Sequence, residues 1–310
     1  MSQTRKTIFI DGEAGTTGLG IRERLATVPE VEIRSIDPDK RKDPAARKAL
    51  MQQVDLVVLC LPDDAAKESV ALADELGADA PKIVDASTAH RVAPGWTYGF
   101  PELEPGFADA VAQASRVSNP GCYPTGGIAL LRPLVDAGLL PADHPVSVNA
   151  VSGYSGGGKA MIEAYEAGTA PDFELYGLGL AHKHLPELQT YARLQRRPIF
   201  VPSVGNFRQG MLVSIPLHLD TLPGRPKPAD LEAALTARYA GGTYVTVVPA
   251  EANGKIEPQA LNDSNRLELR VFGNAAAGQV VLVARLDNLG KGASGAAVQN
   301  IRLMLGLPQG

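Results

Sequence analysis

The stretch KTIFIDGEAGTTGLGIRERL, residues 6–25, decides the fold. An apolar, β-branched run at residues 6–10 predicts a short strand, and residues 17–25 predict a helix. Between them Gly12, Gly15 and Gly18 form a G-x-x-G-x-x-G turn, whose backbone amides and helix start could bind a pyrophosphate. The spacing departs from G-x-G-x-x-G, so an ordinary tight turn is the alternative interpretation.

Strands and helices continue to alternate after this turn. Strand patterns occur at residues 32–36, 56–59 and 82–85, a polar helical segment closes at residues 50–53, and a helix runs from Asp63, as its cap, to residue 76. Repeats of strand, helix and strand form a parallel sheet with right-handed crossovers. We therefore expect the first part of the chain to be a Rossmann-like, parallel-sheet nucleotide domain.

The pattern changes after residue 122. A helix at residues 123–137 ends at Gly138, and longer strands follow at residues 211–219, 266–272 and 279–286, the last two spaced as a hairpin. A final helix at residues 293–307 places three apolar side chains on one face, namely Val298, Ile301 and Leu305. These patterns predict a second, α+β domain with a mixed or antiparallel sheet, and so an α/β protein of two domains.

Composition and charge exclude several classes of protein. The 310 residues suffice for two cores, and 45% hydrophobic with 21% charged residues is ordinary for a globular protein. A net charge of −4 without a long basic stripe gives no reason to bind nucleic acid. No stretch approaches the roughly 20 apolar residues that a membrane span requires, and the N-terminus does not have the pattern of a signal peptide. With only two cysteines, the chain has no disulfide framework. We expect a cytoplasmic protein that acts on a small molecule.

Cys122 lies between a turn and a helix start, in the sequence SNPGCYPT at residues 118–125. The Asn-Pro-Gly turn reverses the chain, and Pro124 suits the first helical turn. Backbone N–H groups and the positive end of the helix dipole at such a position favour a thiolate and could receive an oxyanion. A buried cysteine that acts as a small hydrophobe is the alternative, which the polar, turn-forming neighbours weaken. We therefore favour a nucleophile.

The sequence HKHLPE at residues 182–187 holds two of the five histidines of the chain. His182 and His184 could be zinc ligands, but no third ligand lies close in the sequence. An acid/base partner for Cys122 is therefore favoured over a metal ligand, and we predict no metal site.

Several other polar residues could bind anions. At the end of the second strand, Asp37 could accept from a ribose 2′-hydroxyl, whereas the basic residues 40–42 could pair with a 2′-phosphate, and a solvated charged loop explains the run equally well. Arg91 and Arg208 lie in polar loops and suit a carboxylate or a phosphate, or are surface arginines. Ser155 begins a Ser-Gly-Gly-Gly-Lys tract, which lets the backbone approach a ligand or is a plain flexible loop.

Together these segments resemble the N-acetyl-gamma-glutamyl-phosphate reductases of arginine biosynthesis, in the shorter form of that family. The resemblance covers nearly the whole chain, and its specific parts are the cysteine segment and the His-x-His-x-Pro-Glu segment. It implies a Rossmann domain of residues 1–121 completed by residues 288–310, and a catalytic and oligomerisation domain of residues 122–287. It also implies the cofactor NADP(H), an acyl-phosphate substrate, and a homodimer or homotetramer.

The resemblance further implies a mechanism and a set of site residues. Cys122 attacks the acyl phosphate, phosphate leaves, NADPH reduces the thioacyl enzyme, and His184 acts as acid/base, which converts N-acetyl-L-glutamyl 5-phosphate to N-acetyl-L-glutamate 5-semialdehyde. The expected substrate-binding residues are Arg91, Ser155, His182, Glu187 and Arg208. The expected cofactor-binding residues are Gly12, Gly15, Thr16, Thr17, Gly18, Asp37, Arg41, Pro62 and Ser87.

Three other functions are alternatives. An aspartate-semialdehyde dehydrogenase would share the fold, the cysteine and the hydride step, but the His-x-His-x-Pro-Glu segment disfavours it. A catalytically silent NADPH-binding regulator would bind the dinucleotide without turnover. A thiol hydrolase or acyltransferase would form thioesters without a nicotinamide.

Overall fold

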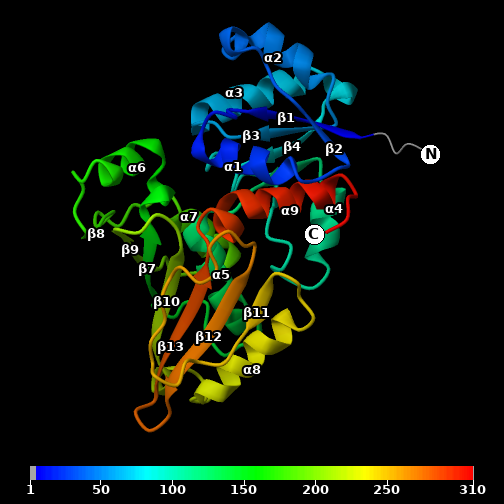
Figure 1. Cartoon of the computed structure of the whole chain (residues 1–310). Coiled ribbons are helices and arrows are strands. Elements are labelled where there is room, and N and C mark those ends of the chain that lie inside the picture. Colours follow the sequence, from blue (N-terminus) through cyan, green and yellow to red (C-terminus); the bar gives the residue numbers. More distant parts are fainter. Residues whose placement is uncertain (1–4, 310) are drawn as a thin grey trace. The chain divides into compact units, whose positions relative to one another are not determined.

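The computed structural model describes residues 5–309, which divide into two compact units. Unit 1 contains residues 5–101, 106–120 and 293–309, and unit 2 contains residues 102–105 and 121–292. Figure 1 labels the helices and strands of both units. The chain enters unit 2 twice, first for the short segment 102–105 and later for the long stretch that begins one residue before Cys122.

Unit 1 is built on a six-stranded sheet of order β2-β1-β3-β4-β6-β5, in which the strands pair in parallel. The strands are β1 (Lys6–Asp11), β2 (Val31–Arg34), β3 (Leu56–Leu59), β4 (Lys82–Asp85), β5 (Thr97–Tyr98) and β6 (Arg116–Ser118). The helices are α1 (Thr16–Leu25), α2 (Pro44–Met51), α3 (Asp63–Asp74), α4 (Phe107–Gln113) and α9 (Gly295–Met304). The Rossmann-like parallel sheet expected from the sequence is confirmed.

Both faces of this sheet are buried, because side chains alternate along each strand. Ile8 and Ile10 of β1 point to the face covered by α1, α4 and α9, whereas Phe9 points to the face covered by α2 and α3. Figure 1 shows α1 and α9 on one side of the strands and α2 and α3 on the other. Ile301 and Met304 of α9 therefore share a core with the first strand of the chain.

Unit 2 contains a seven-stranded mixed sheet of order β11-β12-β13-β10-β7-β9-β8. Its strands are β7 (Ser147–Gly153), β8 (Phe173–Leu175), β9 (Ile199–Gly205), β10 (Met211–His218), β11 (Val245–Val247), β12 (Leu267–Asn274) and β13 (Gln279–Leu286). Its helices are α5 (Cys122–Asp136), α6 (Lys159–Glu166), α7 (Leu185–Tyr191) and α8 (Pro228–Tyr239). β12 and β13 form the predicted antiparallel hairpin, while β7 with β9 and β11 with β12 pair in parallel. The mixed sheet is confirmed.

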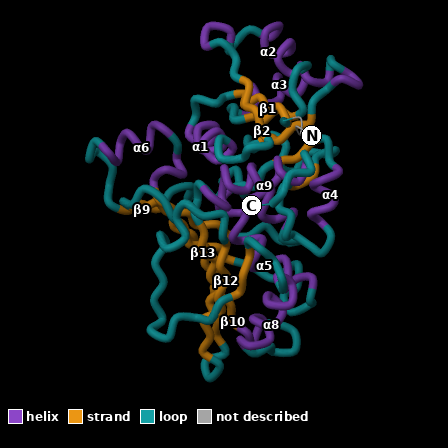
Figure 2. The backbone as a smooth tube through the Cα atoms, turned by 45° about the vertical axis from the view of Figure 1, so that its right-hand side comes forward, coloured by secondary structure: helices purple, strands orange, loops and turns teal. Residues whose placement is uncertain are grey.

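Helices cover one face of the unit 2 sheet. α5 packs on β10 and β13, and α8 packs on β11 and β12, on the same side of the strands (Figure 2). Alternate side chains of the opposite face line an apolar groove that crosses five strands. The apolar side chains of this groove include Val151, Phe173, Leu175, Val201, Leu212 and Val283. We call this surface the open sheet face.

Two local predictions are wrong. Asp63 is not the cap of α3, because Pro62 holds that position and the Asp63 carboxylate accepts hydrogen bonds from the N–H and the hydroxyl of Thr88. The C-terminal helix is shorter than predicted, because a π turn, Gly290–Ser294, precedes α9. The buried side chains of α9 include Ala297, Ile301 and Met304, with Val298 and Leu305 packed partly buried against the same core.

Candidate active site

Cys122 is the first residue of α5, as the turn before it predicts. Gly121, which has no side chain of its own, holds the cap position in an extended conformation. The Gly121 carbonyl accepts hydrogen bonds from the N–H and the hydroxyl of Thr125 at 3.0 and 2.9 Å. Because α5 is 15 residues long, its dipole favours negative charge on the Cys122 sulfur.

Glu187 connects this helix start to the segment with the two histidines. α7 begins at Leu185, directly after His184, and Pro186 lies in its first turn. Glu187 is 1% exposed, and its Oε1 accepts a hydrogen bond from the N–H of Gly121 at 2.7 Å. A buried carboxylate therefore holds the starts of α5 and α7 together.

The two histidines lie against the aromatic ring that follows Cys122. The ring centroid of Tyr123 is 5.9 Å from that of His184 and 6.3 Å from that of His182, and the two imidazole centroids are 4.7 Å apart. The backbone N–H of His184 donates to Nδ1 of His182 at 3.2 Å, so His182 helps to set the backbone of His184. The structure thus brings both histidines and the start of α5 into one region of unit 2.

Two tyrosine hydroxyls extend this region. Tyr123 donates to the carbonyl of Ser203 and accepts from Tyr176, each at 3.0 Å. Burial raises the pKa of Tyr123, and burial together with the charge of Cys122 raises the pKa of Tyr176 to about 12. Both hydroxyls therefore stay protonated near neutral pH. Sequence reasoning missed Tyr176, because only the pairing of β8 with β9 brings its segment to the start of α5.

Ser155 belongs to a second group of loops in unit 2. Its hydroxyl accepts from Nδ2 of Asn288 at 2.9 Å, and Oδ1 of Asn288 accepts from the N–H of Gly210 at 2.8 Å. The Ser155 N–H donates to the carbonyl of Arg208 at 3.0 Å. The Arg208 guanidinium itself is more than half exposed and pairs with Glu166 at 2.8 Å. Ser155 is therefore buried in this network, whereas the Arg208 side chain forms a surface ion pair.

The glycine turn of unit 1 leaves no space for a side chain at two positions. Gly12 has a φ of +91°, and a Cβ there would lie 2.4 Å from the carbonyl oxygen of Cys60. A Cβ at Gly18 would lie 2.6 Å from the carbonyl oxygen of Gly12. Gly15, which has no side chain of its own, caps α1, which begins at Thr16. The bare backbone turn and the helix start fit the pyrophosphate of a dinucleotide.

Buried polar groups lie at the ends of β1 and β4. Asp11 accepts from Nη2 of Arg47 at 2.6 Å, and both residues are buried. Asp85 accepts from the N–H and the hydroxyl of Ser87 at 2.8 Å each, and its Oδ2 lies 2.6 Å from Nδ1 of His90. Ser87, expected to bind the cofactor, therefore donates its hydroxyl to the buried carboxylate of Asp85.

The other anion-binding candidates of unit 1 lie apart in the fold. Arg91 is 8% exposed, and its Nε donates to the carbonyl of Asn119 at 3.1 Å, so it braces the loops after β4 and β6. Asp37 is exposed and caps the short 3-10 turn Pro38–Lys40, while Nε of Arg41 donates to the carbonyl of Pro38 at 3.1 Å. Unit 1 thus contains Arg91, whereas Ser155, His182, Glu187 and Arg208 lie in unit 2.

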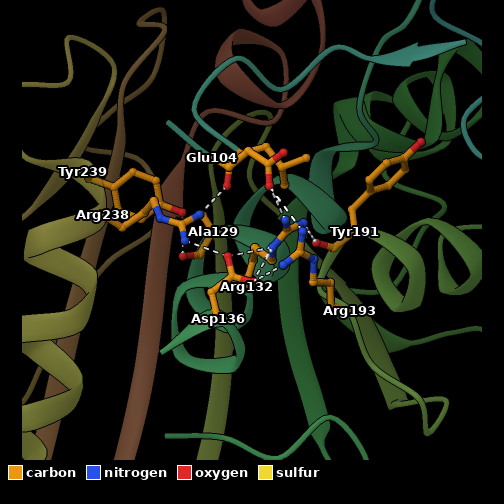
Figure 3. Close-up of polar contacts among 9 residues, drawn as sticks. Glu104, Ala129, Arg132, Asp136, Tyr191, Arg193, Arg238 and Tyr239 are labelled. Carbon is orange, nitrogen blue, oxygen red and sulfur yellow. Dashed lines mark hydrogen bonds and ion pairs between the residues drawn. The ribbon is translucent and has the colours of Figure 1, made fainter. Parts of the chain in front are cut away.

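Sequence reasoning missed an ion-pair network in unit 2 (Figure 3). Arg132 of α5 is 4% exposed and pairs with Glu104 and with Asp136. Arg238 of α8 pairs with Asp136 at 2.6 Å, and the more exposed Arg193 pairs with it at 2.8 Å. These residues come from four separate segments, so no local pattern relates them.

Cys60 differs from Cys122 in its surroundings. It follows β3, and burial, with smaller contributions from the charges of Asp85 and Asp11, raises the pKa of its thiol to about 12. Cys60 is therefore a protonated, weakly reactive thiol near neutral pH.

Within residues 5–309, no group of three or more His, Cys, Asp and Glu side chains could hold a metal ion, and no helix is long and apolar enough to cross a membrane.

Two family models match the chain. The dimerisation domain of semialdehyde dehydrogenases matches residues 122–288, and the NAD binding domain of semialdehyde dehydrogenases matches residues 38–111. A protein named N-acetyl-gamma-glutamyl-phosphate reductase from Chelativorans sp. (strain BNC1) is 56% identical, over 96% of this chain and 97% of the relative. A protein of the same name from Brucella ovis is 55% identical, over 96% of this chain and 98% of the relative.

Solved structures share the fold at low identity. Aspartate semialdehyde dehydrogenase II from Vibrio cholerae, complexed with ASA, has a TM-score of 0.72 at 14% identity, over 98% of this chain and 99% of that chain. Aspartate semialdehyde dehydrogenase with NADP from Candida albicans has a TM-score of 0.65 at 14% identity, over 97% and 99% of the two chains. These structures confirm the two-domain fold, and the full-length identity to the relatives confirms the resemblance inferred from the sequence. The chain therefore belongs to the N-acetyl-gamma-glutamyl-phosphate reductase family of semialdehyde dehydrogenases, with the NAD-binding domain of that group.

Proposed function

We propose that this chain reduces N-acetyl-L-glutamyl 5-phosphate to N-acetyl-L-glutamate 5-semialdehyde with NADPH and releases phosphate, as a step of arginine biosynthesis. The observation that carries the proposal is the hydrogen bond from the Gly121 N–H to Glu187, because it holds the helix start of Cys122 beside the helix that follows His184. The full-length identity to relatives named for this reaction supports the same conclusion.

Cys122 is the nucleophile in this proposal. Its thiolate attacks the acyl carbon, a C–S bond forms, the C–O bond to phosphate breaks, and a thioacyl enzyme results. Backbone N–H groups at the start of α5 stabilise the oxyanion that forms during the attack. A thioester accepts hydride more readily than a carboxylate does, which is the chemical reason for a sulfur nucleophile.

His184 is the acid/base group. It takes the thiol proton before the attack, and as an imidazolium it stabilises the oxygen anion of the tetrahedral species before the C–S bond breaks and the aldehyde leaves. Such help is worth about 100- to 10,000-fold in rate. His182 and Glu187 act around this group by setting the backbone of His184 and of Gly121. We assign substrate binding to Arg91, Ser155, His182, Glu187 and Arg208.

Unit 1 would hold NADPH, which when bound supplies the hydride that reduces the thioester. The residues that we assign to it are Gly12, Gly15, Thr16, Thr17, Gly18, Asp37, Arg41, Pro62 and Ser87. Asp37 already caps the turn that follows it, so its carboxylate is engaged with the Asp39 N–H at 3.1 Å. The basic run at residues 40–42 is exposed next to this cap and favours a 2′-phosphate, and hence NADP over NAD.

We also infer a homodimer, or a homotetramer of such dimers, that forms through the open sheet face. The groove on this face has a volume of about 470 Å³, and at its edge Phe173 and Leu175 are 57% and 50% exposed. Exposed apolar patches of this kind mark interaction sites. The match of residues 122–288 to a dimerisation domain supports this inference.

We further propose a division of the chain by function. Residues 1–121 with 288–310 bind the cofactor, and residues 122–287 provide catalysis and subunit contacts.

The reverse reaction tests the function. The protein is mixed with phosphate, NADP+ and either N-acetylglutamate semialdehyde or aspartate semialdehyde, and NADPH formation is followed by absorbance. We expect turnover with the acetylated compound, and a preference for aspartate semialdehyde would overturn the substrate. Cys122→Ser should abolish turnover while NADPH binding, measured by fluorescence, is kept. Undiminished turnover in Cys122→Ser would overturn the nucleophile.

A further inference from the structure

A buried ion pair lies beside the turn that contacts Cys122. Lys291 is 1% exposed, and its Nζ lies 2.8 and 2.9 Å from the two carboxylate oxygens of Glu102. The ammonium also lies 5.2 Å from the ring centroid of Tyr244. Burial lowers the pKa of Lys291, and the charge and hydrogen bonds of Glu102 act in the opposite direction. Neither Lys291 nor Glu102 has a part in the mechanism described above.

The turn that carries Lys291 packs directly on Cys122. Lys291 lies in the π turn Gly290–Ser294, and a Cβ on the next residue, Gly292, would lie 2.8 Å from Cβ and 3.3 Å from Cα of Cys122. The Gly292 N–H donates to the carbonyl of Asp287 at 2.9 Å. The backbone at Gly292 therefore packs closely against the first residue of α5. A small displacement of Gly292 would change the space around the thiol. Short π turns inside helices often lie at functional sites.

The other end of the ion pair is tied to the helix that begins with Cys122. Glu102 and Glu104 belong to the short segment 102–105 of unit 2, and Glu104 pairs with Arg132 of α5 (Figure 3). Arg132 thus pairs with Glu104, and Glu102, two residues earlier in the same segment, pairs with Lys291. Gly292, next to Lys291, packs on Cys122 at the start of the same helix. These contacts together fix residues 290–292 relative to α5.

Stability alone is a weak reason for this pair. Removing two charges from water costs free energy that their attraction often does not recover, and an apolar replacement of similar volume is frequently as stable. A lysine between both oxygens of one carboxylate does, however, hold its backbone in a defined place. We propose that the Glu102–Lys291 pair is a positioning pair, which holds residues 290–292 against Cys122 and so sets the direction of the thiol toward the acyl phosphate. This proposal rests on the proposed role of Cys122.

Variants that separate position from charge test the proposal. Lys291→Met leaves Glu102 buried without its cation, so the decisive variant is the double substitution Lys291→Met with Glu102→Gln, which removes both charges. The readouts are the melting temperature, kcat and KM of the reverse reaction, and the rate at which iodoacetamide alkylates Cys122 at several pH values, mapped by mass spectrometry to separate it from Cys60. We expect the double variant to melt close to the parent, with kcat lowered about tenfold to a hundredfold, slower alkylation and an unchanged KM for NADP+.

A matched control and a fallback keep the test decisive. Lys48→Met removes a surface pair with Glu75 in unit 1 and should leave kcat and alkylation unchanged. A double variant with the parental kcat and alkylation rate would overturn the positioning role. If the double variant does not fold, Lys291→Arg, which keeps the charge but changes its shape, decides by the same two measurements. Alkylation needs no substrate, so slower alkylation combined with an active Cys122→Ser would show that the proposed function fails while the positioning role stands.

Discussion

Glu187 and Gly121 are joined by a hydrogen bond of 2.7 Å, from a backbone N–H to a buried carboxylate. Glu187 lies in the first turn of α7, three residues after His184, and Gly121 caps the helix that begins with Cys122. A single side chain therefore determines how the starts of two helices meet. Because the acceptor is charged and out of contact with water, the bond is stronger than a neutral one.

Removing this acceptor should impair catalysis. Glu187→Ala leaves the Gly121 N–H without its partner, which costs about 1.5 to 3 kcal/mol of stability. The start of α5 is then less well placed for attack, so kcat should fall about tenfold to a hundredfold. Glu187→Gln keeps an acceptor oxygen and should retain more activity. The reverse reaction measures kcat, and Glu163→Ala, which removes an exposed carboxylate, is the control. Equal losses in the alanine and glutamine variants would show that the charge matters rather than the hydrogen bond.

Alanine at two glycines of the dinucleotide turn should have effects of different size. A Cβ at Gly18 would lie 2.6 Å from the carbonyl oxygen of Gly12, whereas a Cβ at Gly15 meets that oxygen at 3.6 Å. We expect Gly18→Ala to lower the free energy of unfolding by about 1 to 3 kcal/mol, because backbone must move. Gly15→Ala should lower it by less than about 1 kcal/mol, because alanine is a poorer helix cap than glycine but also restricts the unfolded chain. Urea unfolding measures both, and equal destabilisation would contradict the steric argument.

The parallel unit was predictable because its signals are local. The apolar runs at residues 6–10, 56–59 and 82–85 predict strands, and the structure has the strands β1, β3 and β4 there with nearly the same bounds. Strands buried on both faces have continuous apolar sequences, which are easily recognised. Cys122 and the pair of histidines were found in the same way, because turn residues and a short motif mark them.

Contacts between distant segments were not predictable from the sequence. Lys291 and Arg132 lie in helical or turn segments where a charged residue normally faces water, and only the folded structure shows that they are 1% and 4% exposed. Arg208 illustrates the opposite case, since a loop arginine that suits an anionic substrate forms a surface pair with Glu166. A strand as short as β8 carries too few residues for its period to be read.

Charge on the open sheet face should disrupt the subunit contact. Phe173 and Leu175 are exposed within one chain, so a lysine at either position costs the monomer little but would be buried without a partner in the dimer. Phe173→Lys with Leu175→Lys should therefore shift the protein to a smaller species in sedimentation velocity. Val92→Lys replaces an apolar side chain of unit 1 that is 45% exposed and should not change the species. An unchanged mass in the double variant would place the contact elsewhere.

Asp136 should make the stability of unit 2 sensitive to acid. Burial raises the pKa of this carboxyl, but hydrogen bonds from Arg238 and Arg132 and the charges of Arg132 and Arg193 outweigh burial and hold the pKa below its usual value. The folded state therefore binds its proton less readily than the unfolded chain. The stabilisation is fully present above the unfolded pKa of about 4 and is lost as the pH falls through the lower folded pKa.

Asp136→Asn should accordingly flatten the acid dependence of folding. The free energy of unfolding of the parent should fall below about pH 4, whereas the variant should start lower near pH 6 and lose less on acidification. Urea unfolding at several pH values from about 6 down to about 2 measures both curves. Asp64→Asn is the isosteric control, because Asp64 is 96% exposed, and its curve should follow that of the parent. If Asp136→Asn kept the parental slope, the acid sensitivity would lie in other carboxylates, such as Glu268, whose pKa is lowered by Arg285 and Arg270 against the effect of burial.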